Sequence, residues 1–213
     1  MAFDAYIFDL DGTLLNTLPD LVNLTNMVLR EWDMPERTTE EINSFVGGGA
    51  RVLLQKAVSP GTPDETIDTI LARWKDLYPE YGHQFTQPYD GMPDVLAELK
   101  SQGAKLGVLS NKFDAAVVSV IGEHFPGVFD SARGECPEIP RKPDPTGLRW
   151  MMARFGVEPE QVAYVGDSGG DMTVAQAAGA FPIGVTWGYR SADELRERGA
   201  RVLINSPREL LNI

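Results

Sequence analysis

The segment Tyr6-Ile7-Phe8-Asp9-Leu10-Asp11-Gly12-Thr13 joins an apolar run to two carboxylates that stand one residue apart. Because side chains of a strand alternate between its two faces, Asp9 and Asp11 are predicted to project the same way while Leu10 points into the core. Two carboxylates at the end of a buried strand are costly unless a cation or a reaction requires them. A hard divalent cation such as Mg²⁺ accepts such oxygens. The segment therefore predicts a buried strand that ends in a chemical site.

Two kinds of sequence pattern surround this segment. Residues 17–82 carry apolar positions at helical spacing only, and Thr38 with Glu41 forms a predicted capping box. From Tyr89 onward, strand patterns alternate with helical ones, which is typical of a parallel sheet with helices on both faces. We therefore predict a doubly wound, Rossmann-like α/β core domain over residues 1–15 and 85–213. An all-helical domain over residues 16–84 is predicted to be inserted into it directly after the first strand.

The elements of the predicted core follow from period, caps and breakers. Strands are expected over residues 105–109, 128–132, 162–165, 182–185 and 201–204. Helices are expected over residues 94–100, 114–124, 146–155 and 171–178, with two more that begin at Ser191 and Ser206. Thr17-Leu18-Pro19-Asp20 has the pattern of a helix cap with proline in the first turn.

Polar segments follow several of the predicted strands. In an open parallel sheet, ligands bind at the carboxyl ends of the strands, so these segments are expected to meet. Together they supply a nucleophilic carboxylate, further acids, a hydroxyl and a fixed cation, which fits metal-assisted phosphoryl transfer through an aspartyl-phosphate. The segments are Asp9-Leu10-Asp11, Ser110-Asn111-Lys112, Arg141-Lys142-Pro143-Asp144-Pro145 and Gly166-Asp167-Ser168-Gly169-Gly170-Asp171.

The residues of the first segment carry the predicted reaction steps. Asp9 is expected to attack phosphorus, and Mg²⁺ screens its approach to the anionic phosphate. Asp11 is expected to protonate the leaving oxygen and then to accept a proton from the water that hydrolyses the acyl phosphate. Backbone N–H groups of the Gly12-Thr13 turn are expected to face phosphate oxygens.

The remaining segments are expected to bind the phosphate and the metal. The Ser110 hydroxyl and the Asn111 N–H would hold one phosphate oxygen, and Lys142 would supply a compact positive charge. The predicted metal ligands are Asp9, Asp11 and Asp167. Asp171 lies one helical turn after Asp167, where it is expected to orient Lys142 or a metal-bound water.

These residues resemble the four motifs of the haloacid dehalogenase superfamily, in the family's order and across the whole chain. The motifs are Asp-x-Asp-Gly-Thr, Ser-Asn, Lys-Pro and Gly-Asp-Ser-x-x-Asp. The helical insertion resembles the superfamily's helical cap. Within the superfamily the chain is most similar to phosphoglycolate phosphatases, on residues 11–20, 46–49 and 186–190. The family often has Asp where this chain has Asn16, a difference that touches none of the predicted catalytic residues. The resemblance implies a Mg²⁺-dependent hydrolase of a small phosphate monoester, with phosphoglycolate as the leading substrate.

Other interpretations stay open on the sequence. A sugar-phosphate mutase similar to β-phosphoglucomutase, or another small-metabolite phosphatase of the superfamily, would use the same motifs. A signalling receiver domain or a non-catalytic binding protein belongs to another class. Within the helical insertion, Gly47-Gly48-Gly49 either separates two helices or forms a loop that closes over the substrate. In the second case Gly48, Gly49 and Arg51 would bind substrate, with Arg51 paired to a carboxylate.

Composition limits the partners and the compartment. Asp and Glu number 31 against 19 Lys and Arg, a formal net charge of −12, which disfavours nucleic acid and anionic membrane surfaces. A small phosphorylated metabolite is the expected partner, with the protein a monomer or homodimer. The single cysteine, Cys136, suits a reducing cytoplasm. The first strand begins too early to leave room for a signal peptide, and a cytoplasmic protein is expected.

Overall fold

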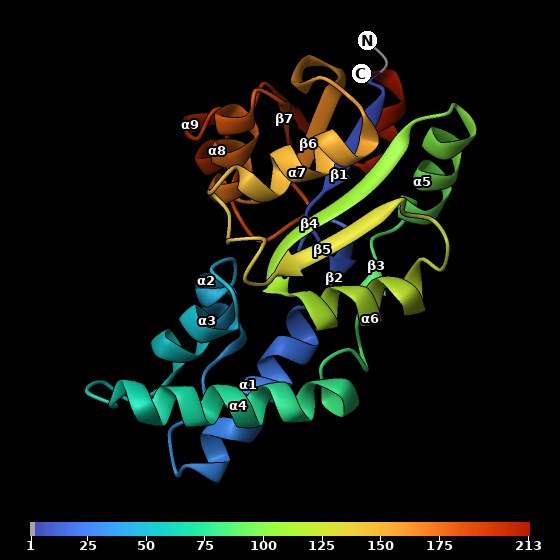
Figure 1. The fold of residues 1–213 in the computed structure, drawn as a ribbon. Helices are drawn as coiled ribbons and strands as arrows, with labels where there is room; N and C mark the ends of the chain where they lie inside the picture. Colours follow the sequence, from blue (N-terminus) through green and yellow to red (C-terminus); the bar gives the residue numbers. More distant parts are fainter. Residues whose placement is uncertain (1–2) are drawn as a thin grey trace. The chain divides into compact units, whose positions relative to one another are not determined.

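A computed structural model describes residues 3–213 (Figure 1). Contacts within the chain separate two compact units. The α/β unit comprises the residues up to Asn16 together with Pro88–Ile213, and the helical unit comprises Thr17–Gln87. These limits lie after residues 16 and 87, whereas the sequence places the domain limits after residues 15 and 84.

The α/β unit is built on a six-stranded sheet in which all the strands are parallel. Its order is β5-β4-β1-β6-β7-β8, so the chain starts in the middle, extends to one edge and then to the other. This is the doubly wound arrangement predicted from the sequence, and it is confirmed. The strands are β1 (Ala5–Phe8), β4 (Lys105–Phe113), β5 (Ser131–Glu135), β6 (Val162–Gly166), β7 (Phe181–Val185) and β8 (Val202–Ile204).

Helices cover both faces of this sheet (Figure 1). Right-handed crossovers place α5 and α6 on one face and α7, α8 and α9 on the other. In agreement, α7 packs against α8 and α8 against α9, while α5 packs against the turn η2. A buried apolar cluster that includes Ile7, Tyr164 and Met151 fills the layer below α7 and α8. The helices are α5 (Met92–Ser101), α6 (Asp114–His124), α7 (Thr146–Phe155), α8 (Gly169–Ala178) and α9 (Ala192–Glu197), with 3₁₀ turns η1 (Pro159–Gln161) and η2 (Pro207–Asn212).

Strand β4 continues four residues beyond its predicted end at Leu109. A register shift between Leu109 and Phe113 lets the strand stay paired with β5 as far as Glu135. Because of this extension, Ser110, Asn111 and Lys112 belong to the strand and are buried, whereas the sequence placed them directly after its end. The last predicted helix, which begins at Ser206, is instead a 3₁₀ turn, and Ser206 and Glu209 form a capping box at its start.

The helical unit contains four α-helices among its described residues. Helix α1 packs against each of the other three, and α3 packs against α4. The predicted capping box of Thr38 and Glu41 is confirmed at the start of α2. The helices are α1 (Leu18–Glu31), α2 (Thr39–Phe45), α3 (Ala50–Ala57) and α4 (Asp64–Tyr81). Two short strands, β2 (Leu15–Asn16) and β3 (Gln87–Pro88), pair as a separate two-stranded sheet.

The predicted start of α1 is confirmed, with Thr17 as the N-terminal cap residue and proline in the first turn. The Thr17 side chain, however, makes no capping hydrogen bond. Asp20 is fully buried, and its carboxylate accepts hydrogen bonds from the Phe85 backbone N–H at 3.0 Å and the Thr86 hydroxyl at 2.7 Å. The acid therefore ties the start of the helical unit to its end.

Among residues 3–213, no helix combines the length and the apolar character needed to cross a membrane.

Candidate active site

The carboxyl ends of three strands of the α/β unit meet at one edge of the sheet. Strand β1 lies between β4 and β6, and Phe8 is in register with Val108 on one side and Val165 on the other. The polar residues that follow these positions are therefore neighbours, although the segments lie 99 positions (Asp11 to Ser110) and 55 positions (Lys112 to Asp167) apart in the sequence. The sequence predicted this gathering from the general rule for open parallel sheets.

Lys142 occupies the centre of the site. Its buried Nζ lies 2.8 Å from Asp9 Oδ1 and 2.7 Å from Asp171 Oδ1. Burial acts to lower the pKa of Lys142, but the carboxylates of Asp171 and Asp9 outweigh it and hold this pKa well above its ordinary value. The ammonium group is therefore a permanent positive charge at the sheet edge.

The position of Lys142 is fixed through its backbone by Asn111. The Lys142 N–H donates to Asn111 Oδ1 at 2.6 Å, and Asn111 Nδ2 donates to the Lys142 carbonyl at 3.2 Å. The sequence assigned only the Asn111 N–H, to a phosphate oxygen, and that assignment stays a prediction. The side chain instead joins β4 to the loop that carries the lysine.

Asp171 is fully buried, and its carboxylate contacts three residues. Its Oδ1 accepts from Lys142 Nζ, and its Oδ2 accepts from the backbone N–H of Ser168 at 2.9 Å and from the Ser168 hydroxyl at 2.6 Å. The Tyr164 hydroxyl lies 3.3 Å from Oδ1 and also donates to the Leu109 carbonyl at 2.9 Å. Asp171 thus both caps α8 and orients the lysine.

Three buried carboxylates form an all-oxygen cluster. Asp9, Asp167 and Asp171 each offer one oxygen within 4.8 Å of the others. Burial, with the Asp171 charge second, raises the pKa of Asp9 to about 7, against the opposing pull of Lys142. Burial likewise raises the pKa of Asp167 to about 8, with Asp171 and Asp9 adding to it. Such a cluster is unfavourable when ionised and metal-free, and it has the donor chemistry of a hard divalent cation.

Asp167 is held by the loop after β1 and by the segment after β7. Thr13 Oγ1 donates to its Oδ1 at 3.1 Å, and the Tyr189 N–H donates to its Oδ2 at 2.7 Å. Gly12 has φ +85°, and a Cβ at this position would lie 2.4 Å from Asp167 Oδ2. The indole Nε1 of Trp187 donates to the Thr13 carbonyl at 3.1 Å. Glycine is therefore required at position 12 for both conformation and space.

The carboxylate of Asp11 contacts a residue that sequence reasoning missed. Lys112 Nζ donates to Asp11 Oδ1 at 3.0 Å and to Oδ2 at 3.3 Å. The predicted metal set of Asp9, Asp11 and Asp167 thus differs from the observed cluster, which has Asp171 in place of Asp11. Lys112 lies in the polar segment that follows the predicted strand, but its contact with Asp11 depends on which strands are neighbours and not on local sequence.

Comparisons with known proteins agree with this geometry. Residues 6–185 match the family described as haloacid dehalogenase-like hydrolase. The chain belongs to the haloacid dehalogenase-like hydrolases. The predicted superfamily and the predicted phosphatase class are thereby confirmed.

Several relatives of this hydrolase carry phosphatase names. Phosphoglycolate phosphatase 1 of Pseudomonas aeruginosa is 32% identical over 211 residues, which cover 96% of this chain and 77% of that protein. The N-acetylmuramic acid 6-phosphate phosphatase of the same organism is 30% identical and covers 100% of this chain and 95% of its own. The crystal structure of a predicted phosphoglycolate phosphatase from Haemophilus somnus has a TM-score of 0.90 at 28% identity, over 99% of this chain and 97% of that one.

Three predicted substrate residues of the hydrolase lie in the helical unit. Gly48 lies between α2 and α3, and Gly49, with φ +83°, is the N-terminal cap residue of α3. The Arg51 guanidinium pairs with Asp68 at 2.9 Å and with Asp64 at 3.0 Å. These exposed ion pairs give Arg51 a role within its own unit, and substrate binding by the three residues stays a prediction.

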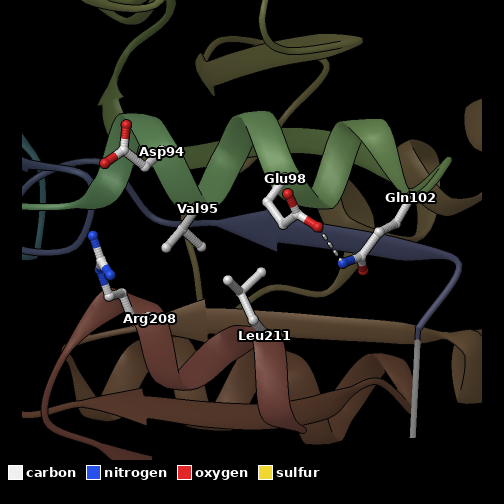
Figure 2. Close-up of a pocket in the computed structure, with 6 residues that line it drawn as sticks. All are labelled: Asp94, Val95, Glu98, Gln102, Arg208 and Leu211. Carbon is white, nitrogen blue, oxygen red and sulfur yellow. Dashed lines mark hydrogen bonds between the residues drawn. The ribbon is translucent and has the colours of Figure 1, made fainter.

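A separate surface hollow of about 300 Å³ lies between α5 and η2 (Figure 2). Val95 and Leu211 line its floor, and Asp94, Glu98 and Arg208 stand around it. Gln102 donates to Glu98 along α5 at 3.0 Å (Figure 2). None of the predicted site residues lines this hollow.

The raised pKa values predict how the stability of the metal-free hydrolase depends on pH. Asp9 and Asp167 bind protons more tightly in the folded than in the unfolded chain, so stability should fall as pH rises from about 4 to about 8. The loss is at most about 1.4 kcal/mol per pH unit for each group. Mg²⁺ should offset it at pH 8 because the cation binds the folded form.

Urea unfolding with chelator or Mg²⁺ at pH 5, 6.5 and 8 measures this effect. The matched variant Asp167→Asn removes one of the two groups and should show a shallower decline. An equal pH dependence in the wild type and the variant would contradict the assignment.

Proposed function

We propose that this hydrolase removes phosphate from a small phosphate monoester through an aspartyl-phosphate formed on Asp9. The observation that supports this most directly is the Lys142 ammonium held 2.8 Å from Asp9 and 2.7 Å from Asp171. A carboxylate nucleophile with a fixed cation beside it can approach a dianionic phosphate that would otherwise repel it.

Asp9 and Asp167 would hold Mg²⁺, with Asp171 the third carboxylate of the same cluster. Asp11 was also predicted from the sequence to be a ligand of Mg²⁺. Bound Mg²⁺ supplies positive charge that neutralises the phosphate and the attacking carboxylate. The raised pKa values of Asp9 and Asp167 support a cation at this position, because a divalent ion would stabilise the ionised carboxylates that burial and the neighbouring charges disfavour.

The chain's own residues then account for two displacement steps. In the first, an Asp9 oxygen bonds to phosphorus, the ester P–O bond breaks, and the leaving oxygen takes a proton from Asp11. In the second, water bonds to phosphorus, Asp11 takes back a proton, and the bond between phosphorus and Asp9 breaks. Inorganic phosphate leaves and the Asp9 carboxylate is restored. The Lys142 charge, the Ser110 hydroxyl and the Asn111 N–H would stabilise the phosphate oxygens throughout. The N–H groups of Gly12 and Thr13, which the sequence assigned to phosphate oxygens, instead donate to the carbonyls of Leu15 at 2.9 Å and Leu10 at 3.3 Å.

Phosphoglycolate is the proposed substrate, because relatives with that activity in their names align over nearly the whole chain. N-acetylmuramic acid 6-phosphate is the second candidate, since a phosphatase so named is 30% identical over the full chain. Both substrates carry a carboxylate besides the phosphate. A mutase remains the alternative reaction, in which a sugar hydroxyl replaces water in the second step.

Phosphate release from a panel of monoesters, with Mg²⁺ and with chelator, tests the proposal. The panel holds phosphoglycolate, N-acetylmuramic acid 6-phosphate, a hexose phosphate and p-nitrophenyl phosphate. We expect Mg²⁺-dependent release with the highest kcat/KM for phosphoglycolate. A preference for the muramic acid ester would replace the substrate but keep the reaction. Absence of release from every ester, with phosphoryl transfer between sugar positions instead, would favour the mutase.

A further inference from the structure

The buried ammonium of Lys112 has no place in the reaction described so far. We propose that Lys112 is a positioning residue that holds the Asp11 carboxylate in the orientation needed for proton transfer. The inference rests on the proposed function, because it assigns Lys112 to the acid–base step of that reaction.

The contact between the two side chains is close and shielded from water. Lys112 Nζ lies 3.0 Å from one Asp11 oxygen and 3.3 Å from the other, and the side chains are only 4% and 15% exposed. Burying either charge alone would be strongly unfavourable, so each is retained because of the other. A donor that contacts both oxygens also restricts the rotation of the carboxylate.

Strand β4 places Lys112 beside Asp11. Lys112 lies between Leu109 and Phe113, where the register of β4 with β5 shifts, and its backbone N–H donates to Ser110 Oγ at 3.2 Å. The lysine therefore comes from the strand that pairs with β1, and β1 leads into Asp11.

The two lysines at the carboxyl ends of the strands contact different carboxylates. Lys142 pairs with Asp9 and Asp171, and Lys112 pairs with Asp11. The cluster suited to a metal comprises Asp9, Asp167 and Asp171. Lys112 therefore contacts the carboxylate assigned to proton transfer, whereas Lys142 contacts the nucleophile and a carboxylate of the cluster.

Steady-state kinetics of Lys112→Met test the inference. The substrates are a series of aryl phosphates whose leaving groups become less acidic, together with phosphoglycolate. We expect kcat to fall about 10–100-fold for the poorest leaving groups, a part of the general acid–base contribution, and less for p-nitrophenyl phosphate. KM should stay within about threefold, because phosphate binding is left to other residues. Lys112→Arg, which keeps the charge, should recover part of the loss. Lys105→Met is the matched control, an exposed lysine at the start of the same strand.

A double-mutant cycle with Asp11→Asn separates positioning from general damage to the fold. If Lys112 acts through Asp11, Lys112→Met should lower kcat little further in the Asp11→Asn background. Equal losses in both backgrounds, or an unchanged leaving-group dependence, would overturn the inference. If Lys112→Met does not fold, the same cycle is made with Lys112→Gln, which keeps a donor. Absence of turnover by the wild type on every ester would instead refute the proposed function.

Discussion

We expect Asp9→Asn to lower kcat by about 10⁴-fold or more, while the protein stays folded and at least as stable as the wild type. The amide cannot form the acyl phosphate, so both displacement steps are lost. Its oxygen can still accept from Lys142 Nζ and from the Leu10 N–H, which lie 2.8 and 2.7 Å from the Asp9 carboxylate. Burial and the Asp171 charge raise the pKa of Asp9 to about 7. Replacement of this carboxylate by a neutral amide therefore relieves repulsion in the folded state.

Phosphate release and thermal melting, measured side by side, check this expectation. Transfer of labelled phosphate to the wild-type chain, and not to Asp9→Asn, would locate the intermediate. Asp193→Asn is the control, because that carboxylate is 87% exposed at the start of α9. Turnover by Asp9→Asn within tenfold of the wild type would refute the aspartyl-phosphate mechanism.

Lys142→Met has the largest expected effect on stability. The variant leaves the buried carboxylates of Asp9, Asp167 and Asp171 without the ammonium that pairs with two of them. Breaking a buried ion pair by removing one partner costs about 3–5 kcal/mol, because the charge left behind is uncompensated. Mg²⁺ should recover part of this loss, since a cation in the cluster replaces some of the missing charge.

Urea unfolding at pH 7.5, with chelator and with Mg²⁺, gives the free energies for this variant. Lys105→Met, which removes only an exposed pair with Asp130, should change stability by less than about 1 kcal/mol. If Lys142→Met and Lys105→Met were equally stable in chelator, the Lys142 ammonium would not stabilise the fold.

Some elements of this protein could be predicted from sequence to the residue. Helices α6 (Asp114–His124) and α7 (Thr146–Phe155) have the predicted bounds, because apolar spacing and flanking residues such as Pro145 and Gly156 decide where a helix begins and ends. Strand β5 begins at Ser131 and not at 128, and β4 ends at Phe113 and not at 109. The end of a strand depends on the register with its partner, which local sequence does not contain.

The same distinction applies to the candidate site. Asp9, Lys142 and Asp171 were predicted because each lies in a short motif with its own chemistry. The contacts of Lys112 with Asp11 and of Tyr189 with Asp167 join residues 101 and 22 positions apart, across different strands. Such contacts follow from strand order and register, so they become visible only once the sheet is assembled.

The buried carboxylate of Asp20 has a consequence for how the helical insertion could have entered this chain. Its hydrogen bonds to Phe85 and Thr86 join the first turn of the insertion to its last residues, all within Thr17–Gln87. The insertion therefore fixes the spacing of its own two ends. An insertion whose two ends are held together in this way can be transferred between core domains as one continuous segment. It then places few constraints on the sequence of the core that receives it.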